Sequence, residues 1–91
     1  MHTRPERLLH KPVVQDRMGY SHATLYTRIG EGLFPKPVKI GPKRSAWPES
    51  EVDAMISAHV RGDDDAAIRE LVKRLEAARA RAGLDDHRLA A

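Results

Sequence analysis

The stretch that decides the fold is residues 18–30, which read MGYSHATLYTRIG. Gly19 is typical of a residue that ends a helix, and Ser21 is typical of one that caps the start of the next. Leu25 and Ile29, four residues apart, fall on one side of this second helix, and its other sides are largely polar. A glycine turn that leads into such a helix predicts a helix-turn-helix.

The first helix of the pair is predicted over about residues 11–17. Pro12 suits its first turn, because a backbone N–H has no helical partner there. The inner side of this helix is expected to carry Val14 and Met18, with Val13 beside them. The second helix should end near Gly30 or Gly32, and Ala23 is expected to be small enough to let the two helices approach.

Prolines and glycines are dense downstream, which predicts short elements joined by tight turns. Residues 34–40 predict an edge strand, because residues of different polarity alternate along them and prolines interrupt the run. Residues 45–47 predict the returning strand. The turn between the two strands contains Lys43 and Arg44, so the hairpin has a basic tip.

A third helix is expected over residues 48–61, with acidic residues in the first turn, where the helix dipole favours them. Its apolar positions are Val52, Met55, Ile56 and Val60. Phe34 and Trp47 are expected to pack in the core rather than against a ligand.

One long helix is predicted from about residue 66 to residue 82, with fraying from Gly83 on. The acidic run of residues 63–65 is expected to cap its start rather than bind a cation. The apolar stripe of this helix has to be buried, either by folding back on the domain or by pairing with a second copy. We expect self-association, through Ile68, Leu71, Val72 and Leu75.

These elements predict a mainly α chain with a small β-hairpin: a winged helix-turn-helix in residues 1–62, then a C-terminal helical extension in residues 63–91. The chain contains no cysteine, and its five histidines are scattered, so neither a metal site nor a cofactor is expected. No catalytic set of nucleophile and base is evident. Apolar runs are too short to span a membrane or form a secretion signal, which predicts the cytoplasm.

The charge is divided unevenly along the chain. Residues 1–62 hold ten Lys and Arg against six Asp and Glu, a net +4, whereas residues 63–91 hold six against seven, a net −1. A basic block suits a polyanion, because neutralised phosphates release counterions. A solvated basic surface is the alternative, so charge alone does not decide for nucleic acid.

The predicted second helix and the hairpin together supply the groups that DNA recognition needs. A helix that enters the major groove presents polar side chains to the bases, and here these are Ser21, His22, Thr24, Tyr26, Thr27 and Arg28. Arg28 is suited to bonding a guanine edge or a phosphate. The hairpin is then the wing, which would reach phosphates or a minor groove through Lys36, Lys39, Lys43 and Arg44.

Three ordered blocks carry a resemblance to a known family: MGYSHATLY at 18–26, GLFPKPVK at 32–39 and AWPESEVDA at 46–54. With them the chain resembles the AlpA-like phage regulators and, more broadly, the winged-helix excisionases and the DNA-reading part of MerR-like proteins. The resemblance implies a DNA-reading second helix, a wing, and a place in phage or integrated-element control. The first helix departs from it in being apolar at residues 13–14, and the tail beyond Gly62 has no clear counterpart.

The leading hypothesis is a recombination directionality factor, or excisionase, without catalytic residues. Such a protein would bind double-stranded DNA beside an attachment site as a homodimer or cooperative assembly, bend it, and help an integrase to form the excision complex. A prophage transcriptional regulator is the alternative within the same class. A protein-interaction module without DNA binding is the alternative from another class.

Overall fold

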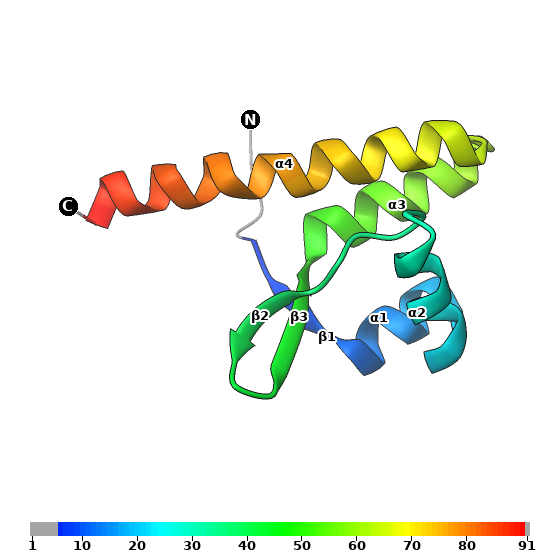
Figure 1. Ribbon diagram of the computed structural model, residues 1–91, viewed down its shortest axis with the longest axis horizontal. Coiled ribbons are helices and arrows are strands. Elements are labelled where there is room, and N and C mark those ends of the chain that lie inside the picture. The colour runs from blue at the N-terminus through cyan, green and yellow to red at the C-terminus, as the bar shows by residue number, and fades with distance from the viewer. Residues whose placement is uncertain (1–5, 91) are drawn as a thin grey trace.

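The computed structural model describes residues 6–90, and the side chains of residues 6–81. The elements follow in the order β1 (Leu8–His10), α1 (Lys11–Met18), α2 (His22–Gly30), β2 (Val38–Gly41), β3 (Arg44–Pro48), α3 (Glu49–Arg61) and α4 (Asp65–Ala90). The described chain is thus mainly helical with a small antiparallel sheet, and α4 lies along α3 above the remaining elements (Figure 1). This confirms the predicted fold class.

The turn between α1 and α2 forms as the sequence predicts. Gly19 adopts the left-handed conformation with φ +70°, which ends α1 without the steric penalty that a Cβ atom would bring. Ser21 caps α2, and its Oγ accepts a hydrogen bond of 3.1 Å from the backbone N–H of Thr24. Leu25 is fully buried and Ile29 packs against the core, so the apolar side of α2 faces inward.

The sheet has three strands in the order β1-β3-β2, so β3 is central and pairs antiparallel with both neighbours. Sequence analysis predicted only the hairpin of β2 and β3, because the three residues of β1 are too few to show a strand period. The predicted strand at 34–40 begins only at Val38. Pro35 and Pro37 have no N–H to give to a ladder, and Pro35 instead accepts a 2.8 Å hydrogen bond from Trp47 Nε1.

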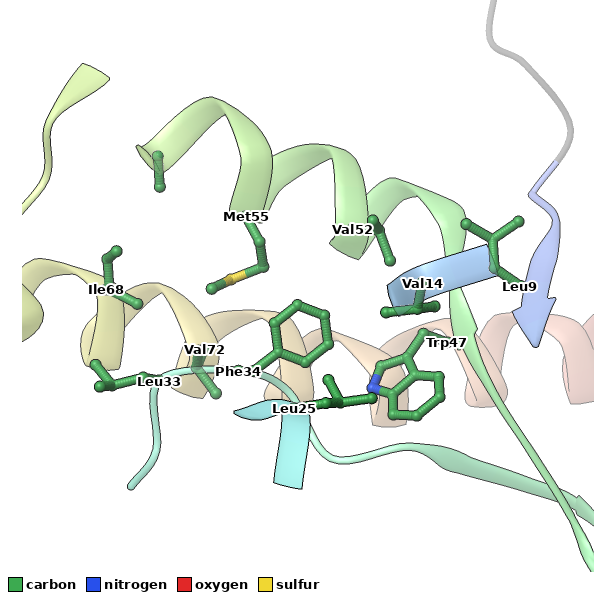
Figure 2. Close-up of a cluster of buried hydrophobic side chains, with 11 residues drawn as sticks. Leu9, Val14, Leu25, Leu33, Phe34, Trp47, Val52, Met55, Ile68 and Val72 are labelled. Carbon is green, nitrogen blue, oxygen red and sulfur yellow. The ribbon is translucent and has the colours of Figure 1, made fainter. Parts of the chain in front are cut away.

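The core is built around two aromatic side chains, as expected. Trp47 and Phe34 are buried, with ring centroids 6.2 Å apart in an edge-to-face arrangement. Figure 2 shows Phe34 between Met55 of α3 and Leu25 of α2. These contacts fix α2 against α3 and the sheet.

Three expectations for apolar or small residues are wrong. Val60 is 82% exposed, because the buried positions of α3 include Val52, Met55 and Ala58, and Val60 lies roughly opposite Ala58 around the helix. Val13 is 45% exposed, on the flank of α1 away from buried Val14. Ala23 is exposed and does not mediate the approach of the helices.

The apolar stripe of α4 folds back on the domain. Gly62, with φ +82°, reverses the chain after α3, and the Oδ1 atom of Asp64 caps α4 by accepting from the N–H of Ala67. Ile68 and Val72 are buried in the core, and Leu71 and Leu75 pack against it. These apolar contacts are made within the chain by Ile68, Leu71, Val72 and Leu75, and the self-association expected of them stays a prediction. The backbone of α4 stays helical to Ala90, past the predicted end near residue 82.

Polar contacts attach α4 to the segment that leads into the wing. Glu51, which is 5% exposed, accepts hydrogen bonds of 2.8 and 2.6 Å from Nε and Nη2 of Arg79. Arg79 also donates to the carbonyl of Lys36 at 2.6 Å, and Glu76 accepts from the N–H of Lys36 at 2.8 Å. Arg69 donates to the carbonyl of Glu31 at 2.9 Å. The hydrogen bond to Glu51 raises the pKa of Arg79, so this cation keeps its proton.

Candidate nucleic-acid interface

The exposed and half-buried residues of α2 fall into three groups, according to the side of the helix that they occupy. Ala23 and Thr27 are exposed and lie opposite the buried Leu25, so they are outermost. His22 and Tyr26 occupy the flank toward the wing, with ring centroids 4.8 Å apart. The other flank carries Thr24 and Arg28. Ser21 is engaged in capping, and its Oγ also donates a 2.9 Å hydrogen bond to Thr24 Oγ1.

A hollow of about 280 Å³ lies between α2 and the wing. Its basic side chains are Lys11 from the start of α1 and Lys43 and Arg44 from the wing tip. Tyr26 and Ser45 add hydroxyl groups, and no Asp or Glu is among the residues that line it. The structure therefore brings together Tyr26, Lys43 and Arg44, three of the residues predicted to contact DNA.

Lys11 is a member of this surface that sequence reasoning missed. Its Nζ lies 3.1 Å from His22 Nδ1 and 5.5 Å from the centroid of the Tyr26 ring. The sequence indicates a cation at the start of the first helix. Nothing near it in the sequence indicates that its side chain reaches across to α2. Its position depends on how α1 and α2 cross.

Arg28 lies on the flank of α2 away from the wing. It is half-buried and lines a shallow hollow together with Tyr20 and the exposed end of α3, including His59 and Val60. Burial raises the pKa of the Tyr20 phenol, and the positive charge of Arg28 opposes this shift more weakly. The structure does not bring Arg28 together with the wing tip, so the two would contact DNA at separate places.

The four predicted wing cations separate into two groups. Lys43 and Arg44 are exposed at the tip, and Lys39 is exposed on β2 opposite Ser45. Lys36 precedes β2 and lies against α4, with its backbone held by Glu76 and Arg79. Lys36 is thus outside the hairpin, which corrects its assignment to the wing.

The described residues show neither a metal-binding group nor a membrane span. No three His, Asp or Glu side chains among them are arranged to hold a metal ion. No helix in the same part of the chain is long and apolar enough to cross a membrane.

Comparison with known proteins gives a family and one related phage protein. Residues 7–60 match the family model described as prophage CP4-57 regulatory protein (AlpA). The chain is also 40% identical over 57 residues to the uncharacterized protein ORF88 of Enterobacteria phage P4, a match that covers 63% of this chain and 65% of that protein, or less than two thirds of its length. No solved structure matches the chain. Because the family model spans more than half of the chain, from β1 through the wing to the last turn of α3, this protein belongs to the AlpA family of prophage regulatory proteins.

Proposed function

We propose that this protein is a regulator of a prophage or related mobile element and acts by binding double-stranded DNA through α2 and the wing. The observation that carries the proposal is the convergence of Tyr26, Lys43 and Arg44 on one hollow that no carboxylate lines. Such a surface suits phosphates, because each neutralised phosphate releases counterions. The family's description as regulatory proteins supports the same function and gives no reason to assign a catalytic step.

In the proposed complex α2 lies in the major groove. Ala23 and Thr27 are then nearest the base edges, where an alanine or threonine methyl group suits the methyl group of thymine. Arg28 and Thr24 reach one wall of the groove, and His22 and Tyr26 reach the other. Lys43 and Arg44 continue to the backbone or to the next minor groove, with Lys39 following along β2.

Within this function we propose that the protein directs excision, as a recombination directionality factor. In this complex α2 and the wing contact the DNA on either side of the hollow between them. Such a pair of contacts favours DNA that curves around the protein, since bending lets more of the duplex touch the surface. Several protomers would assemble cooperatively on adjacent sites, with an integrase as the partner. Because the described apolar stripe of α4 packs within the chain, this assembly is proposed to form on DNA rather than through that stripe.

The experiment is a gel-shift and bending assay with DNA from the element's attachment site, combined with an excision assay with and without the protein. We expect specific shifted bands, a bend centred on the bound sites, and excision that depends on the protein. Specific binding without bending, together with unchanged excision, would reject the excisionase role. No shift on any duplex would reject DNA binding and favour a protein-interaction module.

Control of prophage transcription is the second candidate, favoured by the family description itself. A reporter fused to the element's promoters, in cells that lack the integrase, separates the two roles. Reporter output that changes with the protein favours transcriptional control. Output that stays constant while excision changes favours the excisionase role.

A further inference from the structure

We propose that the hollow between α2 and the wing, which the start of α1 also lines, is a binding seat for one phosphodiester of the DNA backbone, with Lys11 as its principal cation. This inference rests on the proposed DNA binding and adds to it a defined contact that neither α2 nor the wing supplies alone. The ligand is a single phosphate group, and the site is the space that Lys11, Lys43 and Arg44 surround.

The shape of the hollow fits such a ligand. Three separate parts of the fold form it: the β1–α1 junction, Tyr26 of α2, and the wing from Lys43 to Ser45, with Trp47 also lining it. Trp47 is fully buried, so this part of the wall is fixed by the core. About 280 Å³ is the space of several water molecules at roughly 30 Å³ each, which admits a phosphate group.

The charge of the hollow is uncompensated within the protein. Several other cations in the described residues are paired: Arg17 with Asp53, Arg61 with Asp63, and Arg79 with Glu51. No described carboxylate lies within ion-pair distance of the three cations that line the hollow, which are Lys11, Lys43 and Arg44. A phosphate would supply the missing negative charge.

Lys11 is held in place by two ring side chains of α2, those of His22 and Tyr26. Its ammonium donates to His22 Nδ1 at 3.1 Å and lies 5.5 Å from the centroid of the ring of Tyr26, which itself lines the hollow. Both partners leave its positive charge available, and the hydroxyl groups of Tyr26 and Ser45 add two further donors. Lys11 is thus positioned as a cation in a preformed anion site would be, and not as a lysine that extends freely into solvent.

The seat has a defined place in the proposed complex. A backbone strand separates the major groove, which α2 would enter, from the minor groove, which the wing tip would reach. A phosphate held between these two elements fixes the register of the protein on the duplex without reading a base. Lys11 would therefore contribute to affinity for every sequence rather than to base preference.

The test uses the full chain with Lys11→Gln, and Lys73→Gln as the matched control, because Lys73 is an exposed lysine on α4. The duplex is one that the wild-type protein selects from a random-sequence pool. We expect Lys11→Gln to weaken binding about tenfold near 0.1 M salt and to lower the slope of log K against log salt by about one. Lys73→Gln should behave as wild type, and equal unfolding midpoints check that all three proteins fold.

A second measurement locates the phosphate. Duplexes with one neutral methylphosphonate, placed at each backbone position in turn, should reveal a position that weakens the wild-type protein more than it weakens Lys11→Gln, which keeps Lys43 and Arg44 at the site. The phosphate site is rejected, and DNA binding is not, if Lys11→Gln binds DNA with the affinity and salt slope of the wild type. The same holds if a methylphosphonate at every position weakens both proteins equally. If the wild-type protein selects no duplex, the proposed function and the seat both fail.

Discussion

At the scale of single residues, Ser21 caps α2 with its hydroxyl group, and Trp47 and Phe34 fill the core. A serine after a glycine turn caps a helix, and large aromatic rings in a small chain are buried. Lys11 and Arg28 show where such reasoning ends. Their residue type indicates a cation, but whether a cation faces the wing or the opposite flank of α2 depends on how the helices cross, and no local pattern in the sequence encodes this.

Trp47→Phe tests the hydrogen bond that ties β3 to the segment before the wing. The ring stays apolar, but the carbonyl of Pro35 loses its 2.8 Å donor in a buried place. We expect the free energy of unfolding to fall by about 1–3 kcal/mol, measured by urea denaturation. Tyr26→Phe, at an exposed aromatic residue, should change it by less than about 0.5 kcal/mol. Equal effects of the two changes would contradict the assigned role of Trp47.

Arg28→Ala and Lys43→Ala distinguish base reading from phosphate contact. We expect Arg28→Ala to reduce the binding free energy by about 1–3 kcal/mol and to relax base preference at one position. Lys43→Ala should weaken binding to all sequences alike and flatten the salt dependence. Fluorescence anisotropy with matched and mismatched duplexes measures both. Unchanged affinity in both variants would contradict the placement of α2 and the wing on DNA.

The helices α1, α2 and α3 could be predicted to within a residue or two, because caps and glycine turns mark their ends. The strand β1 could not, since Leu8–His10 becomes a strand only through pairing with β3. The apolar spacing of α3 predicts a buried Val60, but this residue is exposed. The spacing continues beyond the part of the helix that the rest of the domain covers. Tertiary packing, rather than local spacing, decides such positions.

The contact between α3 and α4 is tested by Arg79→Ala. This change leaves the buried Glu51 carboxylate without its two hydrogen bonds and frees the carbonyl of Lys36. We expect the free energy of unfolding to fall by about 3 kcal/mol, since an unpaired buried charge is strongly unfavourable. Arg74→Ala, at an exposed arginine on the same helix, is the control and should match wild type. If the two variants are equally stable, the Glu51–Arg79 pair does not secure α4.

The molecule forms one core across the predicted boundary at Gly62. Ile68 and Val72 of α4 join Phe34 and Met55 in the same cluster, so the boundary separates helices but not cores. The stripe of α4 has the same spacing whether it meets a second copy or the chain's own domain, and the sequence therefore left both alternatives open. The groups that select folding back, Glu51 and Arg79, lie 28 positions apart in the chain.

Removal of residues 63–91 should therefore disrupt the remaining domain. Without Ile68 and Val72, the side chains of Leu33, Phe34 and Met55 lose part of their cover. We expect the shortened chain to lose its cooperative thermal transition and its near-ultraviolet circular dichroism, as small cores have little stability to spare. A cooperative transition at the full-chain midpoint would show instead that residues 1–62 fold independently.

The central claim is that α2 and the wing form the DNA-binding surface of this AlpA-family protein. Amide chemical-shift mapping of the full chain, titrated with a duplex selected by the protein, tests it most directly. The account predicts the largest shifts at Lys11, in residues 21–28 and in residues 43–45, with small shifts over residues 68–79 of α4. Shifts centred on α4, or an absence of shifts in α2 and the wing tip while the duplex is bound, would contradict it.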